Sequence, residues 1–214
     1  MEVKKVIKDR YDVAGPKLAE TMTKKGYEAY YVGTAAEAKE LALKLIPEGA
    51  SISWGGSATI ADTGLQQELR AGGYKVIDRD TGATPAEKDE IMRQGLLADV
   101  FLMSTNAITK DGEMINIDGR GNRVAALCFG PKEVIVIFGM NKVVGDMNSA
   151  YDRVRNVVAP INTQRLGVDT PCKVTGYCGN CYGPKCVCSQ VVVTRQCKPA
   201  GRIKAIIVGE DLGF

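Results

Sequence analysis

Residues 98–142 read ADVFLMSTNAITKDGEMINIDGRGNRVAALCFGPKEVIVIFGMNK, and this stretch decides the fold that the sequence predicts. It contains two apolar runs, 100–103 and 134–138, which are rich in β-branched or bulky side chains and too short to be helices. Runs of this length and composition are typical of strands buried inside a parallel sheet. We therefore expect two buried strands with a long connection between them.

The connection, residues 106–123, is polar and rich in glycine, and we predict that this loop binds a ligand. It holds an Asp-Gly hairpin turn at 111–112 and a second element, Asp-Gly-x-Gly-Asn-Arg, at 118–123. Glycine permits positive φ and close approach of the backbone to a ligand, and the amides and charged groups exceed what a connector needs. Asp118 is the candidate acid or base, and the candidate ligand-binding residues are Asn106, Asn116, Gly119, Gly121, Asn122 and Arg123.

Patterns on either side of this stretch alternate between strand and helix. Further strands are expected at 27–32, 50–54, 74–77, 191–194 and 202–208. Helices are expected at 5–25, 38–46, 57–71, 85–97 and 147–158, the last of them halted by Pro160. This alternation predicts an α/β fold with a mostly parallel sheet and helices on both faces. We assign residues 1–170 to the α/β domain and 171–214 to a small cysteine-rich, metal-binding appendage with closing strands of the same domain.

Two turns at predicted strand ends add to the candidate site. The glycines at 55–56 follow one strand and open a helix, where backbone N–H groups favour phosphate or carboxylate. A second turn, 139–142, ends in a lysine. Ligands of such sheets bind at the carboxyl ends of strands, so we expect these turns and the 106–123 loop to form one pocket for a small anionic metabolite. The turns contribute Gly55, Gly56, Ser57 and Thr59 as ligand-binding residues and Lys142 as the catalytic partner of Asp118.

A simpler interpretation of the same residues is structural. On that view the glycines only make turns, and the arginines are solvated. We favour the pocket because three elements with ligand-binding character converge at predicted strand ends.

Composition restricts the chemistry. The 214 residues include no histidine, which excludes Ser-His-Asp and Cys-His catalysis and all imidazole metal ligation. The net charge of +3, from 28 basic and 25 acidic residues, is too balanced to argue for nucleic acid or a membrane surface as a partner. Residues 1–5 lack the apolar core of a signal peptide, and no apolar run approaches the length of a membrane span, so we expect a cytoplasmic protein.

Six of the seven cysteines lie between Cys172 and Cys197. In a reducing cytosol such a concentration favours metal over disulfides. Cys178 and Cys181 have the two-residue spacing that points both sulfurs at one metal, but no second such pair follows, so an iron–sulfur cluster and zinc both stay open. Iron–sulfur is our first choice.

We choose four of these cysteines as ligands. Cys186 and Cys188 point in opposite directions if the chain is extended there, so only one of them faces the metal, and Cys186 is the substitute. Cys128, flanked by apolar residues, is expected in the core, and Cys197 is unassigned. The chosen metal ligands are Cys172, Cys178, Cys181 and Cys188.

Several motifs together resemble the LUD domain family, which includes the lactate-utilisation protein C. They are GSAT (56–59), ADVF (98–101), NAI (106–108), NIDGRGNRV (116–124), GMNKVV (139–144) and RVR (153–155). The C-terminus resembles the shorter branch of the family, which carries a Cys-x-x-Cys motif, a further cysteine and Gly-Glu-Asp-Leu-Gly, here 209–213. This resemblance supports Cys188 over Cys186. It also implies a fold similar to the sugar-phosphate isomerase and CoA transferase group and a link to lactate or related organic-acid metabolism.

Two classes of function follow. In the first, the protein binds or converts a carboxylate, phosphate or CoA ester in its strand-end cleft, and the cysteines hold a structural or electron-carrying metal. In the second, it is a non-catalytic subunit or assembly partner of a redox complex, with its cysteine cluster docked against an iron–sulfur protein.

Overall fold

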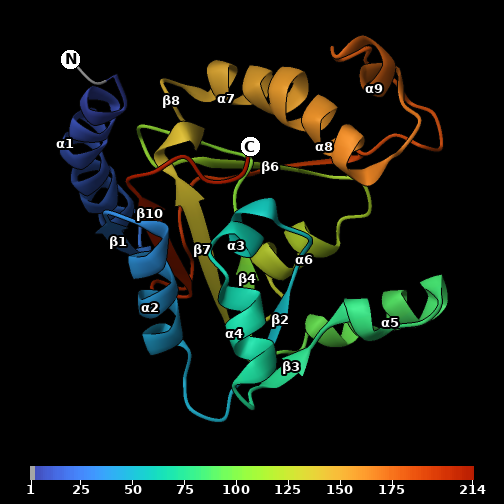
Figure 1. Ribbon diagram of the computed structural model, residues 1–214, viewed down its shortest axis with the longest axis horizontal. Coiled ribbons are helices and arrows are strands. Elements are labelled where there is room, and N and C mark those ends of the chain that lie inside the picture. Colours follow the sequence, from blue (N-terminus) through green and yellow to red (C-terminus); the bar gives the residue numbers. More distant parts are fainter. Residues whose placement is uncertain (1–2) are drawn as a thin grey trace.

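A six-stranded parallel sheet forms the centre of the protein in the computed structural model, which describes residues 3–214 (Figure 1). The strand order is β1–β10–β7–β4–β2–β3, and every neighbouring pair is parallel. The strands are β1 (Glu28–Val32), β2 (Ser51–Trp54), β3 (Lys75–Ile77), β4 (Val100–Met103), β7 (Glu133–Gly139) and β10 (Ile203–Val208). The predicted α/β class with a mostly parallel sheet is confirmed. Met1 and Glu2, which belong to the segment inspected for a signal peptide, lie outside the described residues.

Helices cover both faces of this sheet, as alternate residues of β7 show. Val134, Val136 and Phe138 pack in the cluster that includes α1 (Val3–Lys24) and α6 (Asn122–Cys128). Ile135 and Ile137 point the other way, into the second cluster. That cluster holds α2 (Ala35–Leu45), α3 (Ala58–Asp62) and α4 (Leu65–Ala71). Successive strand residues alternate between faces, so an all-apolar strand such as β7 must be covered on both.

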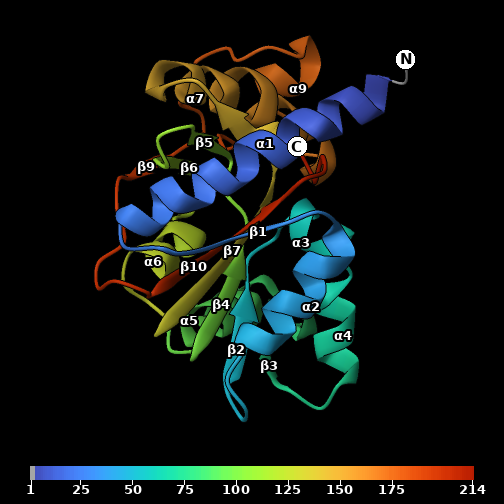
Figure 2. The same cartoon turned by 90° about the vertical axis from the view of Figure 1, so that its left-hand side faces the viewer.

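The N-terminal helix and the cap signals agree closely with the sequence. Figure 2 shows α1 crossing β1 and β10. The helix ends just before Gly26, whose φ of 84° is a conformation that glycine adopts without strain. Thr34 caps α2 through a full capping box with Glu37. Thr84 caps α5 (Pro85–Gly95) in the same way, again with a glutamate three residues on. No helix within residues 3–214 combines the length and apolar character needed to span a membrane.

The prediction of residues 106–123 as a loop is wrong, because this stretch supplies two of the four strands of a second sheet. β5 (Ala107–Thr109) and β6 (Met114–Asp118) form an antiparallel hairpin around Gly112, and α6 then begins. The four-stranded order is β8–β5–β6–β9, with β8 (Val143–Val144) and β9 (Gln190–Thr194) from distant parts of the chain. Such short strands are stable only with these distant partners, which local patterns cannot reveal.

Two helix predictions also need correction. The helix expected over 57–71 is broken into α3 and α4 at Gly64, whose φ is 72°. Pro160 does not halt a helix, because α7 (Met147–Arg153) continues through a π-helix (Val154–Val158) into α8 (Ala159–Leu166). The wider π turn accommodates a residue that lacks an N–H and would clash with the carbonyl one ordinary turn earlier. A last short helix, α9 (Pro171–Thr175), starts the cysteine-rich segment.

The C-terminal residues 209–213 are tied into the molecule. Glu210 accepts a hydrogen bond from the backbone N–H of Ala35, and Asp211 accepts one from the hydroxyl of Tyr11. A Cβ on Gly139 would lie 2.6 Å from the backbone nitrogen of Leu212, so only glycine lets the end of β7 meet this segment. The C-terminus therefore packs beside the turn that carries Lys142.

Candidate functional site

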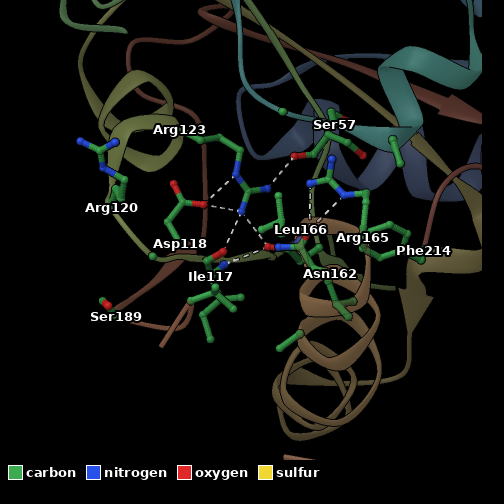
Figure 3. Close-up of a pocket in the computed structure, with 18 of the residues that line it drawn as sticks. Ser57, Ile117, Asp118, Arg120, Arg123, Asn162, Arg165, Leu166, Ser189 and Phe214 are labelled. Atoms are coloured by element: carbon green, nitrogen blue, oxygen red, sulfur yellow. Dashed lines mark hydrogen bonds and ion pairs between the residues drawn. The ribbon is translucent and has the colours of Figure 1, made fainter. Parts of the chain in front are cut away.

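A pocket of about 510 Å³ lies at the carboxyl ends of β2, β4 and β7 (Figure 3). The turns after these strands supply Ser57, Ser104 and Lys142. α8 and residues 183–189 of the cysteine-rich segment also line it. In Figure 3, Asn162 and Arg165 of α8 reach toward Ser57. Strand ends of a parallel sheet are where α/β proteins bind their ligands.

The structure brings nine of the twelve predicted pocket residues to this cavity. They are Gly56, Ser57, Thr59, Asn106, Asp118, Gly119, Asn122, Arg123 and Lys142. Gly55, Asn116 and Gly121 do not line it. The N–H of Gly55 bonds to the carbonyl of Leu102, Asn116 is fully buried, and Gly121, with a φ of 85°, precedes α6.

Arg123 is the most heavily hydrogen-bonded side chain of the site. Its guanidinium donates six hydrogen bonds of 2.7–3.2 Å, which use every N–H that it has. The acceptors, which with Arg123 make up the Arg123 network, are the side chains of Asp118, Asn106 and Asn116 and the backbone carbonyls of Ser104 and Ile117. This network joins the end of β4, the second sheet and α6.

Asp118 is fully engaged by the same network. Its Oδ1 accepts from Nε and Nη2 of Arg123, at 2.9 and 2.7 Å, and its Oδ2 accepts from the N–H of Val124 at 3.0 Å. A carboxylate held in this way has a strong structural role and little freedom to take a proton from a ligand. The geometry therefore assigns Asp118 to positioning Arg123 and α6, in contrast to its predicted role as acid or base.

Lys142 differs from Arg123 because no carboxylate pairs with it within residues 3–214. The side chain is only 3% exposed, and Nζ donates to Oγ1 of Thr59 at 2.7 Å and to Oγ of Ser104 at 3.1 Å. Burial, with smaller contributions from Arg153 and Arg123, lowers the pKa of Lys142 to about 7. The pocket thus contains an amine that is partly neutral near neutral pH.

Basic groups dominate the lining, which has four basic residues and one acidic residue. The acidic residue is Asp118, whose carboxylate pairs with Arg123. Arg120 pairs with Asp89, outside the pocket. Arg165 bonds to Oδ1 of Asn162 and makes no ion pair within the part of the chain that the structure describes. Burial, and then the nearby Arg79, lower the pKa of Arg165.

Sequence reasoning missed Arg165 and Asn162 because the helix that carries them was ended at Pro160. Ser104 was missed although it directly follows a predicted strand, which is the signal that identified the other strand-end residues. The cysteine-rich segment was not expected to line the pocket. Its placement depends on the N–H of Ser189, which bonds to the carbonyl of Asp118, and on Gly119, where a Cβ would lie 3.2 Å from Cα of Val187.

Five cysteines gather on this segment. The sulfur of Cys172 lies 3.2 Å from the hydroxyl of Thr170, and the sulfur of Cys178 accepts from Nη2 of Arg155 at 3.0 Å. Burial, followed by the neighbouring Cys186, raises the pKa of the Cys188 thiol to about 12. Cys172 and Cys178 act in the same direction on Cys188, and Cys186 and Cys172 raise the pKa of Cys181, so these thiols lie within electrostatic reach of one another. Cys186 itself lines the pocket.

The remaining cysteines lie elsewhere. Cys128 was expected in the core but is exposed, because it closes α6 on the solvent side. Cys197 is buried between β9 and β10, and its sulfur accepts a hydrogen bond from the N–H of Ile203. Within residues 3–214, no three cysteine or carboxylate side chains are arranged to hold a single metal ion.

Fold and site together define an α/β protein with a cation-rich pocket at the carboxyl ends of a parallel sheet. The sequence profile described as LUD domain matches residues 16–208, and the chain belongs to the LUD domain family. A DUF162 family protein from Deinococcus radiodurans has a similar structure, with a TM-score of 0.55 and 15% sequence identity. The alignment covers 92% of this chain and 97% of that one, and it supports the fold alone.

A more distant similarity links the chain to eIF2B delta from Chaetomium thermophilum. The TM-score is 0.33 at 18% identity, over 49% of this chain and 46% of that one. No curated protein matches the sequence.

The lowered pKa of Lys142 predicts a specific pH dependence of stability. Between pH 7 and 10.5 the unfolded lysine carries a proton that the folded lysine has lost, so unfolding becomes harder as pH rises. Relative to Lys142→Met, the wild type should gain up to about 1.4 kcal/mol of unfolding free energy per pH unit in this window. Urea denaturation at a series of pH values measures this difference. The control is Lys132→Met, which removes an exposed lysine paired with Asp99, and the wild type should show no such gain relative to this variant. A difference between the wild type and Lys142→Met that does not change with pH would contradict the burial of a neutral amine.

Proposed function

We propose that this LUD-domain protein binds a small anionic metabolite, a carboxylate, phosphate or CoA ester, in the strand-end pocket. The carrying observation is the charge of the lining, in which the only acidic residue is committed to Arg123 while Lys142 and Arg165 have no carboxylate partner among residues 3–214. The side chain of Lys142 is buried, and a charged amine there is costly unless an anion compensates it. A bound anionic ligand would supply that compensation. The resemblance to lactate-utilisation proteins supports organic-acid metabolism as the context.

Arg165 is the best candidate to hold the anionic group. Its guanidinium keeps donors free beyond those used by Asn162, and a planar guanidinium matches a carboxylate or phosphate with two parallel hydrogen bonds. A Cβ on Gly56 would lie 2.5 Å from Nη2 of Arg79, so the glycine lets this second guanidinium approach the turn before Ser57. Arg79 is also near enough to Arg165 to contribute to the lowering of its pKa.

Thermal shift and calorimetry against lactate, pyruvate, sugar phosphates, CoA esters and nucleotides test this proposal. A ligand at a hundred times its Kd should stabilise the wild type by about 2.7 kcal/mol. Arg165→Gln should weaken its binding at least about tenfold, which corresponds to 1.4 kcal/mol. Arg195→Gln is the matched control, because Arg195 is exposed and remote from the pocket lining. Stabilisation by none of these ligands, or equal binding to both variants, would contradict the proposal.

The cysteine segment is proposed to hold an iron–sulfur cluster, with zinc as the alternative, through Cys172, Cys178, Cys181 and Cys188. The donor chemistry fits, because two threonine hydroxyls lie against the sulfur of Cys172 and a guanidinium donates to that of Cys178. Donors of this kind stabilise thiolates that ligate a metal. Such a group would supply electron transfer or, as zinc, structural support. One of the four ligands, Cys188, stands between Val187 and Ser189, which line the pocket.

Metal analysis of anaerobically purified protein tests this assignment. We expect iron with a broad visible absorption, and loss of both in Cys178→Ser and Cys181→Ser. Cys128→Ser should keep the metal, because that thiol is exposed on α6 and apart from the cluster. A colourless protein with stoichiometric zinc selects the alternative, and a metal content that the two serine variants leave unchanged would refute the assignment.

A role as a non-catalytic subunit of a redox complex is the second candidate function. The cysteine segment exposes large apolar side chains that a free surface does not require: Val174, Tyr177 and Tyr182 are 85%, 75% and 89% exposed. Such groups are typical of protein contact surfaces. This function is favoured if no small anion stabilises the protein while an iron–sulfur partner protein binds it.

A further inference from the structure

The hydrogen bonds around Lys142 show how many acceptors its amine has. Thr59 donates its hydroxyl hydrogen to the carbonyl of Leu212 at 3.3 Å, and Ser104 points its own toward the carbonyl of Thr105 at 3.4 Å. Both hydroxyl oxygens are therefore left to accept from Nζ. A neutral amine has two N–H groups and one lone pair. Two acceptors use both N–H groups and leave the lone pair uncommitted.

The surroundings favour that neutral form. Arg153 at the end of α7 and Arg123 of α6 act on the amine as like charges, and Asp62 of α3 is the acid that opposes them. Asp62 also accepts a hydrogen bond from the N–H of Gly213, which commits one of its oxygens. A lysine that served only to attract anions would gain from a protonated amine and a nearby carboxylate. Lys142 instead has hydroxyl partners and neighbouring arginines. A desolvated lysine beside other cations is an activated nucleophile.

We propose that Lys142 attacks the carbonyl carbon of an anionic aldehyde or ketone and forms an imine with it. This inference rests on the proposed function, because the anionic group of the same molecule would bind the cations of the pocket. It narrows the ligand to a carbonyl compound that also carries a carboxylate or phosphate.

The bonding changes balance without an oxidant or reductant. The lone pair of Nζ forms a C–N bond, and the electron pair of the C=O double bond moves to oxygen, which receives a proton from the nitrogen. A proton from solvent then converts this hydroxyl into water, which leaves, and the product is a protonated C=N bond. The hydroxyls of Thr59 and Ser104 hold the nitrogen in place during the attack.

Reductive trapping tests the proposal. The full-length protein is incubated at pH 7 with pyruvate, with dihydroxyacetone phosphate, or with acetone as the neutral carbonyl, each together with sodium cyanoborohydride. Intact mass and peptide mapping then locate the adduct, whose mass gain is one probe molecule less one oxygen atom. We expect the adduct on Lys142 with one or both anionic probes and at least about tenfold less on Lys132, whose amine is protonated and exposed. The responding probe tells a carboxylate from a phosphate.

Two variants complete the test. Lys142→Arg keeps the positive charge but cannot form an imine and should give no adduct, while Lys132→Arg should label like the wild type. If Lys142→Arg fails to fold, the peptide map of the wild type decides by itself. Absence of an adduct, labelling spread over surface lysines, or a stronger reaction with acetone would overturn the proposal. Thermal shift on the same samples separates imine formation from anion binding. Stabilisation by pyruvate without an adduct would rule out the imine and still support anion binding.

Discussion

The guanidinium of Arg123 holds together the parts of the molecule that form the pocket. It donates to the carbonyl that follows β4, to the side-chain amides of Asn106 before β5 and Asn116 in β6, and to the carboxylate of Asp118 before α6. Arg123 is half-buried, and its ion pair with Asp118 has side chains only 14% and 9% exposed. A buried pair with all donors satisfied is costly to break, because removing one partner strands the other charge. The two sheets therefore keep one relative position around this network.

This network also decides which groups remain for a ligand. Since Arg123 and Asp118 satisfy each other, the basic lining residues that have no carboxylate partner among residues 3–214 are Lys142 and Arg165. The carbonyl of Asp118, at the end of β6, also accepts a hydrogen bond from Ser189 and so holds the cysteine-rich segment beside the cavity. Residues 118–123 thus join the two sheets to the cysteine-rich segment, while Lys142 comes from the separate turn after β7.

The sequence predicted the parts of the fold that depend on local signals. Capping boxes at Thr34 and Thr84 and the apolar run of β7 gave elements close to those observed, and the strand-end rule brought Ser57 and Lys142 to one cavity. Features that depend on distant partners were missed. β6 pairs with β9 and β5 with β8, both from later parts of the chain, and α8 continues past a proline only because a π turn precedes it. The sequence also placed Asp118 and Arg123 at the pocket, but spacing alone could not show that their side chains bond to each other.

Replacing Arg123 by lysine separates its structural role from a ligand-binding role. Lysine keeps the charge but cannot make the six hydrogen bonds of the guanidinium. We predict that Arg123→Lys lowers the unfolding free energy in urea by about 1–3 kcal/mol, because buried acceptors of the guanidinium are left without a donor. A variant that keeps the stability of the wild type and loses only anion affinity would contradict it, because Arg123 would then be a ligand-binding cation and not the support of the pocket.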